Sequence, residues 1–230
     1  EDPRVSEGLT HQLADRRAAL DAGARSLGWK VGFGAPAGLD LMQISAPLMG
    51  YLTDATVIQS GAAVDSAGWE RGIVEFELAV YLGRDLEGGA SEDDARAAVS
   101  AVGPAIELAN INLDLGPAQV SDIVAGDIFH KYVMFGPPDK SRAGLDITGL
   151  LARILVDGKE HSRTADLEAI TGPYPWIVAT VANTLAAHGE ILAGGDVIIT
   201  GSVIPPIPVT DGTEFSFHLD PFAPLSVVVS

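Results

Sequence analysis

The stretch "IVEFELAVYLGRDL" (Ile73 to Leu86) decides how the middle of the chain folds. Successive side chains of a β-strand point to opposite faces, so residues two apart share a face. One face would carry Val74, Phe76, Leu78 and Val80. The opposite face would carry Glu75, Glu77, Ala79 and Tyr81. The stretch therefore predicts a strand that places two carboxylates side by side.

The two glutamates have two interpretations. On an edge strand that faces water they are ordinary alternation. In a pocket, two parallel carboxylates need a cation or a proton to coexist. A third carboxylate, Glu107, lies in the apolar segment "AIELAN". If all three carboxylates were buried the cost would be large, and a divalent cation would relieve it. Periodicity alone does not favour this interpretation, because acidic pairs on strands are common. All-oxygen ligands suit Mg²⁺, Mn²⁺ or Ca²⁺ better than Zn²⁺. Solvated positions on wet strands remain the alternative.

Composition limits the classes of protein. The 230 residues are 47% hydrophobic and 20% charged, which suits one sizeable core or one large domain with a small appendage. Fourteen basic against thirty-one acidic residues give a net charge of −17, which argues against nucleic acid and anionic membranes as partners. No run of about 18 apolar residues is present, so no membrane span is expected, and the first residues, "EDPRVSEGLTHQLADRR", lack the apolar stretch typical of a signal peptide. The absence of cysteine excludes disulfides and thiolate sites, and a cytoplasmic location is expected.

Elements before the acidic strand are mostly helical. Residues 6–27 have helical spacing, 28–34 ("GWKVGFG") read as a buried strand carrying Lys30, and 35–46 read as a short helix. After the acidic strand, Ser91 and Asp94 form a capping box for a helix that we expect to run to Val102 and to end at Pro104.

The second half is rich in strands. We expect strands at 105–113, at "YVMFGPP" and at "GGDVIITGS", a hairpin over 151–164 that turns at Asp157-Gly158, and one or two strands at the C-terminus. A helix spans 175–189, with Pro near its start and Gly after its end. The prediction is an α+β, β-dominated fold with a helical N-terminal part (1–60) packed on a core (61–230).

Five segments carry a family resemblance over nearly the whole chain: "GWKVGFG", "VEFELAVYLGRDL", "AIELAN", "WIVATVANTLAAHG" and "GDVIITGSVIPPIPV". In this order they resemble the 2-keto-4-pentenoate hydratase and 4-oxalocrotonate decarboxylase family of the fumarylacetoacetate hydrolase superfamily. The resemblance implies a mixed β-roll or sandwich with outer helices. It also implies Mg²⁺ or Mn²⁺ bound by three carboxylates, a 2-oxo acid substrate and a homo-oligomer.

The resemblance also assigns residues. Glu75, Glu77 and Glu107 match the metal ligands, and Glu77 and Lys30 are the expected catalytic groups. A lysine beside a metal-bound oxyanion can donate a hydrogen bond or relay a proton. Ser202 matches a serine near the substrate, with a turn hydroxyl as the alternative.

Several positions depart from the family pattern. Asn110 and Asn112 replace an aspartate and an arginine of the third motif, and Ile204 replaces a threonine after Ser202. His130 and Lys131 stand where small residues are common, so they are candidates for binding the substrate, with a solvent-facing position as the alternative.

The predicted function is hydration of a 2-oxo-4-enoate through a metal-stabilised enolate. The alternatives are decarboxylation of an oxalocrotonate-type acid, C–C hydrolysis of an acylpyruvate, and a non-catalytic or repurposed biosynthetic homologue. No nucleotide-binding loop and no nucleophile elbow is present in the sequence, which disfavours a serine hydrolase.

Overall fold

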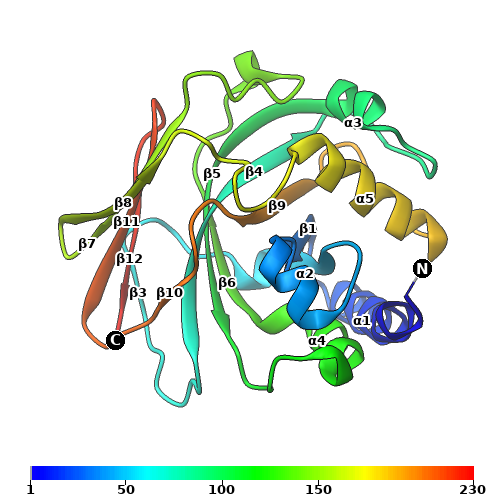
Figure 1. Ribbon diagram of the computed structural model, residues 1–230, viewed down its shortest axis with the longest axis horizontal. Helices are drawn as coiled ribbons and strands as arrows, with labels where there is room; N and C mark the ends of the chain where they lie inside the picture. Colours follow the sequence, from blue (N-terminus) through cyan, green and yellow to red (C-terminus); the bar gives the residue numbers. More distant parts are fainter. Residues whose placement is uncertain (1) are drawn as a thin grey trace.

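Residues 2–230, described by a computed structural model, form two sheets with helices outside them (Figure 1). The larger sheet has seven strands in the order β2-β1-β9-β4-β5-β6, with β10 paired to β4. Its strands are β1 (Ser26–Gly32), β2 (Leu48–Thr53), β4 (Gly72–Leu82), β5 (Val99–Asn110), β6 (His130–Phe135), β9 (Val197–Ser202) and β10 (Ile207–Pro208). The β1–β9 pair is parallel and the others are antiparallel, so the sheet is mixed.

The smaller sheet has the order β3-β12-β11-β7-β8. Its strands are β3 (Ala62–Val64), β7 (Leu151–Val156), β8 (Lys159–Thr164), β11 (Thr213–Asp220) and β12 (Leu225–Val229). Phe76 of β4 contacts Phe217 of β11, with ring centroids 5.6 Å apart. The apolar face of β4 therefore packs against the smaller sheet, as expected for a sandwich core.

The opposite face of β4 looks toward the helices. Figure 1 shows α1 (Pro3–Asp21), α2 (Pro36–Met42), α4 (Val120–Ala125) and α5 (Tyr174–Ala187) on the side of the larger sheet that lies away from the smaller one. The remaining helix, α3 (Glu92–Ala98), packs beside α5. Four short 3-10 turns complete the elements: η1 (Asp54–Thr56), η2 (Pro117–Gln119), η3 (Asp127–Phe129) and η4 (Lys140–Arg142). Since β4 has β9 on one side and β5 on the other, it is an interior strand.

Most predicted elements are confirmed. The strand over 72–82, the hairpin that turns at Asp157-Gly158 with both residues at positive φ, and the helix α5 lie where the sequence places them. The capping box of Ser91 and Asp94 is present. Several helix boundaries were wrong. The helix α1 starts at Pro3 and ends at Asp21, ahead of Gly23 at φ 105°. The helix α2 ends at Met42, and α3 ends at Ala98.

The strand β5 begins at Val99, so Pro104 lies inside a strand instead of ending a helix. The carbonyl of Pro104 accepts a hydrogen bond from the amide of Gly136, which follows the last residue of β6. The proline nitrogen, which has no hydrogen to donate, lies on the same side past the end of β6, so no ladder bond is lost.

The predicted division at residue 60 falls between η1 and β3, and β1 and β2 from the first part pair within the sheet of the second part. The division into two parts stays a prediction. Among residues 2–230, no helix is both long and apolar enough to cross a membrane.

Candidate active site

Three carboxylates converge on the helix-facing side of the larger sheet. Glu75 of β4 lies directly opposite Glu107 of β5 in the antiparallel register, and Glu77 lies opposite Ser202 of β9. One carboxylate oxygen from each of Glu75, Glu77 and Glu107 lies within 4.8 Å of the others. The pocket interpretation of the acidic strand is therefore correct, and the solvated-edge alternative is wrong.

Two of these carboxylates are fully buried and incompletely bonded. Glu77 and Glu107 have no exposed surface, and Glu77 Oε1 and Glu107 Oε2 have no hydrogen-bond partner among residues 2–230. The second oxygen of Glu77 accepts a hydrogen bond of 2.5 Å from the amide of Gly201. Gly201 adopts φ 90° where the β4–β9 register shifts, and this bulge turns its N–H toward Glu77.

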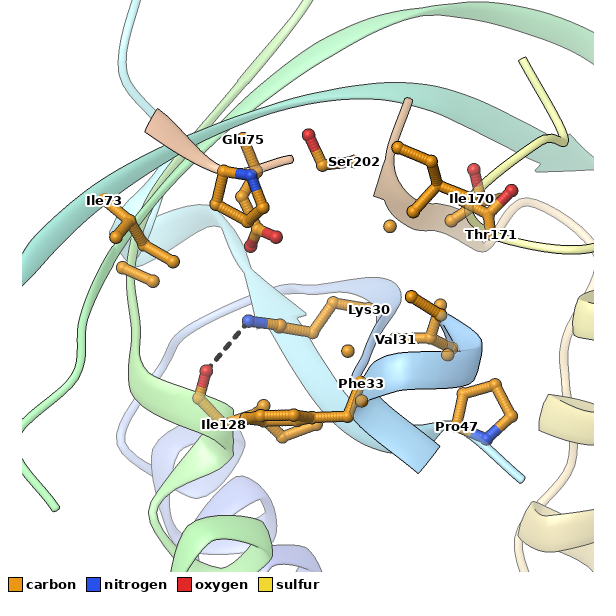
Figure 2. Close-up of a pocket in the computed structure, with 18 of the residues that line it drawn as sticks. Lys30, Val31, Phe33, Pro47, Ile73, Glu75, Ile128, Ile170, Thr171 and Ser202 are labelled. Atoms are coloured by element: carbon orange, nitrogen blue, oxygen red, sulfur yellow. Dashed lines mark hydrogen bonds between the residues drawn. The ribbon is translucent and has the colours of Figure 1, made fainter. Parts of the chain in front are cut away.

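Lys30 supplies the positive charge of the site. It lies in β1, is 1% exposed, and its ammonium donates hydrogen bonds to Glu107 Oε1 and, at 3.0 Å, to the carbonyl of Ile128. Figure 2 shows Lys30 and Glu75 approaching each other across a cavity, from opposite walls. Burial favours a neutral lysine, but the charges of Glu107 and Glu75 outweigh it and raise the pKa of Lys30.

The carbonyl that Lys30 contacts is held in a strained turn. Asp127, Ile128 and Phe129 all have positive φ, at 55°, 47° and 65°. Conformations of this kind cost about 1–2 kcal/mol per residue outside glycine. A hydrogen bond of 2.8 Å from the amide of Tyr51 to Asp127 Oδ1 fixes the turn against β2. Strain kept next to a buried lysine is typical of a functional site.

His130 and Lys131, which follow this turn, have side chains in different surroundings. His130 Nδ1 lies 2.7 Å from Glu107 Oε1, and His130 Nε2 lies 2.9 Å from Thr56 Oγ1. The imidazole thus contacts the carboxylate cluster, but His130 does not line the cavity. Lys131 is exposed and is also absent from the cavity wall. The substrate-binding roles expected for both residues stay predictions.

The pKa values of the cluster diverge. Burial, reinforced by the charge of Glu107, raises the pKa of Glu75 to about 7 and that of Glu77 well above its usual value. Burial alone would raise the pKa of Glu107 too, but Lys30 and His130 lower it. Burial likewise raises the pKa of Asp127 to about 7. One carboxylate is therefore held ionised while its neighbours resist ionisation.

A cavity of about 270 Å³ opens beside Glu75 and Lys30 (Figure 2). Ser202 lies on its wall and its hydroxyl accepts a hydrogen bond of 3.1 Å from the amide of Phe76. Most other wall residues are apolar: Val31, Phe33, Ala35, Pro47, Ile73, Ala109, Ile111, Leu115, Ile128, Phe129, Ile170, Ile177, Ile204 and Pro206. Thr171 and Thr200 add hydroxyl groups.

The positions that depart from the family pattern are of two kinds: two lie away from the cavity and one lines it. Asn110 Oδ1 accepts hydrogen bonds from the amides of Glu70 and Arg71, at 2.9 and 3.1 Å, and Asn112 is exposed. Neither asparagine lines the cavity, so the replacement of the family's aspartate and arginine does not change the cavity wall. Ile204 does line it.

The cluster fits a divalent cation. Three carboxylates offer only oxygen atoms, the donors that Mg²⁺, Mn²⁺ and Ca²⁺ prefer. The two buried oxygens without partners, Glu77 Oε1 and Glu107 Oε2, are polar atoms that native proteins rarely leave unbonded, and a cation would satisfy both.

Sequence reasoning missed several contributors. Asp127 and Thr56 lie in the short turns η3 and η1, which have no periodic sequence pattern, and the amide of Gly201 carries no side-chain signal. The glycine at position 50 is also part of the site, because a Cβ there would lie 2.6 Å from Asp127 Oδ1 and 2.8 Å from Lys30 Cγ. Only the glycine in "MGY" could have pointed to this close approach.

Known proteins resemble this chain in sequence and in fold. The chain is 29% identical to a 2-hydroxyhexa-2,4-dienoate hydratase from Comamonas testosteroni (94% of this chain, 82% of the relative). It is 30% identical to a 2-hydroxypent-2,4-dienoate hydratase from Pseudomonas putida (79% and 81%). A solved structure of 4-oxalocrotonate decarboxylase from Pseudomonas putida G7, complexed with magnesium and adipate, superposes with a TM-score of 0.85 at 25% identity (95% of this chain and 83% of that chain).

The family assignment follows from the match along the chain. Residues 35–230 match the family described as fumarylacetoacetate (FAA) hydrolase, C-terminal. The expected mixed sheets with outer helices are confirmed. The resemblance read from the acidic strand and its companion segments is likewise confirmed. This chain belongs to the fumarylacetoacetate hydrolase family.

Proposed function

We propose that this protein is a divalent-metal-dependent lyase that adds water to a small 2-oxo acid of the 2-hydroxy-2,4-dienoate type. The observation that carries the proposal is the cluster of Glu75, Glu77 and Glu107 beside Lys30 at one end of a largely apolar cavity. The hydratases among its relatives support the choice of reaction.

Glu75, Glu77 and Glu107 would hold the cation, with Mg²⁺ or Mn²⁺ as the proposed metal. A bound divalent cation would polarise the 2-oxo group and stabilise negative charge that develops on it. Lys30 and His130 share Glu107 Oε1 and thereby leave Oε2 for the metal. The N–H of Gly201 orients the Glu77 carboxylate in the same way.

Hydration adds the oxygen of one water to C4 of a 2-oxo-3-enoate. This is the conjugated keto tautomer, which the dienoate reaches when C5 takes a proton and the 2-hydroxyl group loses one. The π-electron pair of C3=C4 shifts toward the 2-oxo group, C3 then takes a proton, and the attacking water loses one. Glu107 and the carbonyl of Ile128 occupy two of the three donors of Lys30, which leaves one N–H for the reacting ligand. We assign proton delivery and oxyanion contact to this group.

Decarboxylation of an oxalocrotonate-type acid is the second candidate, because the superposed decarboxylase covers 95% of this chain at a TM-score of 0.85. C–C hydrolysis of an acylpyruvate comes third, and a non-catalytic or repurposed homologue remains the alternative outside enzymes. The small-molecule ligand, a homo-oligomer, a cytoplasmic location and a place in aromatic catabolism are proposed with this function.

The test is calorimetric titration of Mg²⁺ and Mn²⁺, with and without oxalate as a mimic of the 2-oxo acid head. Wild type is compared with Glu77→Gln, which keeps the side-chain shape, and with Glu214→Gln, an exposed site outside the cluster. We expect oxalate to bind only with metal, Glu77→Gln to abolish this binding, and Glu214→Gln to leave it unchanged. A wild type that binds no divalent cation would overturn the proposal.

A further inference from the structure

A β-bulge brings His130 to the face of the sheet that carries the carboxylate cluster. The pairing of β5 with β6 shifts by one residue after Leu108, so that Ala109 pairs with His130. Without the shift, Lys131 would lie opposite Ala109 and would share the face of Glu107. Bulges commonly re-aim a side chain next to an active site. This bulge therefore places an imidazole, in place of an ammonium, beside the cluster.

The imidazole is fixed at both of its nitrogens. The side chain of His130 is 3% exposed, and its Nδ1 lies 2.7 Å from Glu107 Oε1. An ionised carboxylate only accepts hydrogen bonds, so Nδ1 carries the proton of this contact, and Lys30 donates to the same oxygen. On the far side of the ring, Nε2 lies 2.9 Å from Thr56 Oγ1. The orientation of the imidazole toward Glu107 thus depends on Thr56.

The backbone around Thr56 is anchored on both sides. The amide of Ile58 donates a hydrogen bond of 2.9 Å to the carbonyl of Val133 in β6. At the start of η1, the two oxygens of Asp54 each accept a hydrogen bond of 2.8 Å from Arg25. The turn that carries Thr56 is therefore docked on the strand that begins at His130, and the two side chains are held at hydrogen-bond distance.

Each of the two fully buried carboxylates has one free oxygen. Lys30 and His130 occupy Glu107 Oε1, and the amide of Gly201 occupies Glu77 Oε2. Glu107 Oε2 and Glu77 Oε1 have no partner among residues 2–230. Mg²⁺ requires a near-octahedral set of ligands, whereas Ca²⁺ takes about six to eight oxygens and often both oxygens of one carboxylate. Carboxylates that present a single oxygen therefore suit the smaller cation.

We infer that His130 and Thr56 are positioning residues that make Glu107 present one oxygen, and that they thereby set a preference of the cluster for Mg²⁺ over Ca²⁺. This inference rests on the proposed function, since it takes the cluster as a metal site. It gives His130 a role that requires no contact with the substrate.

The test is calorimetric titration of Mg²⁺ and of Ca²⁺ in separate experiments, and its readout is the ratio of the two dissociation constants. His130→Phe keeps a ring of similar shape but removes both nitrogens. Loss of a residue that orients a metal ligand usually weakens metal binding by about 10- to 100-fold, and we expect this for Mg²⁺. Ca²⁺ binding should weaken by less than about threefold, because Ca²⁺ can use the oxygen that His130 releases.

Matched variants separate positioning from packing. His130→Asn keeps an N–H donor near the place of Nδ1 and should restore most of the wild-type ratio. Thr56→Val removes the hydroxyl and should shift the ratio in the same direction as His130→Phe but by less, whereas Thr56→Ser should leave it unchanged. The control is His161→Phe, an exchange at an exposed histidine of β8, which should also leave the ratio unchanged.

The outcomes distinguish this inference from the proposed function. A wild type that binds no divalent cation would overturn the proposed function itself. If the wild type binds oxalate with metal, but His130→Phe weakens both cations equally, only the role of His130 and Thr56 in selection is overturned. Thr56 is half-buried and valine keeps its shape, so an unchanged ratio in Thr56→Val is equally decisive if His130→Phe fails to fold.

Discussion

Glu75 and Glu107 face each other across neighbouring antiparallel strands, yet their environments push their pKa values in opposite directions. Glu107 shares one oxygen with Lys30 and His130, which stabilises its ionised form. Glu75 has no such partner, so burial and the charge of Glu107 raise its pKa to about 7. In the absence of metal the cluster therefore retains protons, and a cation would replace them.

The first prediction concerns the pH dependence of the metal-free protein. A carboxyl whose pKa rises from 4.5 to about 7 on folding stabilises the fold fully below pH 4.5, and this contribution is lost as pH rises through 7. For Glu75 alone the loss is at most about 3 kcal/mol. We expect the melting temperature in EDTA to fall between pH 5 and pH 8, and Glu75→Gln to flatten that slope.

Added metal should act in the opposite sense over the same interval. A cation must displace protons from Glu75 and Glu77. The apparent affinity of the protein for the cation should therefore rise by up to about tenfold for each unit of increasing pH and each proton released. Thermal unfolding with saturating Mg²⁺ should therefore show a stabilisation that grows from pH 5 to pH 8. A pH-independent effect of the metal would show that the cation binds elsewhere.

The second prediction contrasts two substitutions that both remove a ligand. Glu107→Gln leaves Lys30 buried without its principal counter-charge, which should lower the free energy of unfolding of the metal-free protein by about 3 kcal/mol. Glu77→Gln removes a carboxylate that burial disfavours, so the loss should not exceed about 1 kcal/mol. Urea unfolding in EDTA at pH 7 measures both, and equal losses would contradict the assigned partnership of Lys30 and Glu107.

The third prediction assigns Lys30 to proton transfer and not to metal binding. Lys30→Met should reduce kcat on a 2-hydroxy-2,4-dienoate by about 10²- to 10⁴-fold, the usual range for loss of a general acid or base. Calorimetry should still detect the divalent cation, because the three carboxylates remain. Loss of metal binding together with turnover would instead make Lys30 a positioning residue of the cluster.

Sequence patterns located the carboxylates because a period of two in a strand fixes which residues share a face. The acidic strand placed Glu75 and Glu77 together, and its pairing with the strand around Glu107 brought the third carboxylate alongside. The hairpin at Asp157-Gly158 followed from the φ values that this turn requires. The shared face of Glu75 and Glu77 and the hairpin turn depend on local rules, so the sequence suffices for them. The convergence of Glu107 on the other two carboxylates depends on strand pairing and was expected from the family resemblance.

The residues that complete the site depend on tertiary structure. Ile128 and Phe129 rarely adopt positive φ, so no propensity predicts the turn that presents a carbonyl to Lys30. The sequence also left open whether His130 faces solvent, and only the tertiary structure places its imidazole between Glu107 and Thr56. The start of β5 at Val99 was missed because the alanines before it favour a helix and only the sheet decides otherwise.

The fourth prediction concerns Asn110, which stands where the family pattern has an aspartate and could therefore have altered the active site. Its side-chain oxygen, Oδ1, accepts hydrogen bonds from two backbone amides, and its side chain does not line the cavity. Asn110→Ala should therefore lower the free energy of unfolding by about 1–2 kcal/mol. Metal and oxalate affinities should remain within about twofold of wild type. Asn110→Asp keeps the acceptor and should restore most of the stability, whereas a large loss of oxalate affinity in either variant would place Asn110 in the site.

The fifth prediction tests the close approach at Gly50. This glycine lies opposite Lys30 in the β1–β2 pair, and a Cβ at position 50 would lie 2.6 Å from Asp127 Oδ1 and 2.8 Å from Lys30 Cγ. Gly50→Ala must therefore displace Lys30 or the Asp127 turn, and misplaced catalytic groups reduce rates by about 10²-fold. We expect kcat to fall by about 10²-fold in Gly50→Ala, with the affinity for the metal changed by less than tenfold.

Gly116→Ala is the control for Gly50→Ala, because its added Cβ would meet only Gln119 Oε1, at an ordinary 3.4 Å. It should leave kcat and metal affinity unchanged. Wild-type kcat in Gly50→Ala would show that Lys30 tolerates displacement, which is incompatible with a proton donor held in place by Glu107 and the carbonyl of Ile128.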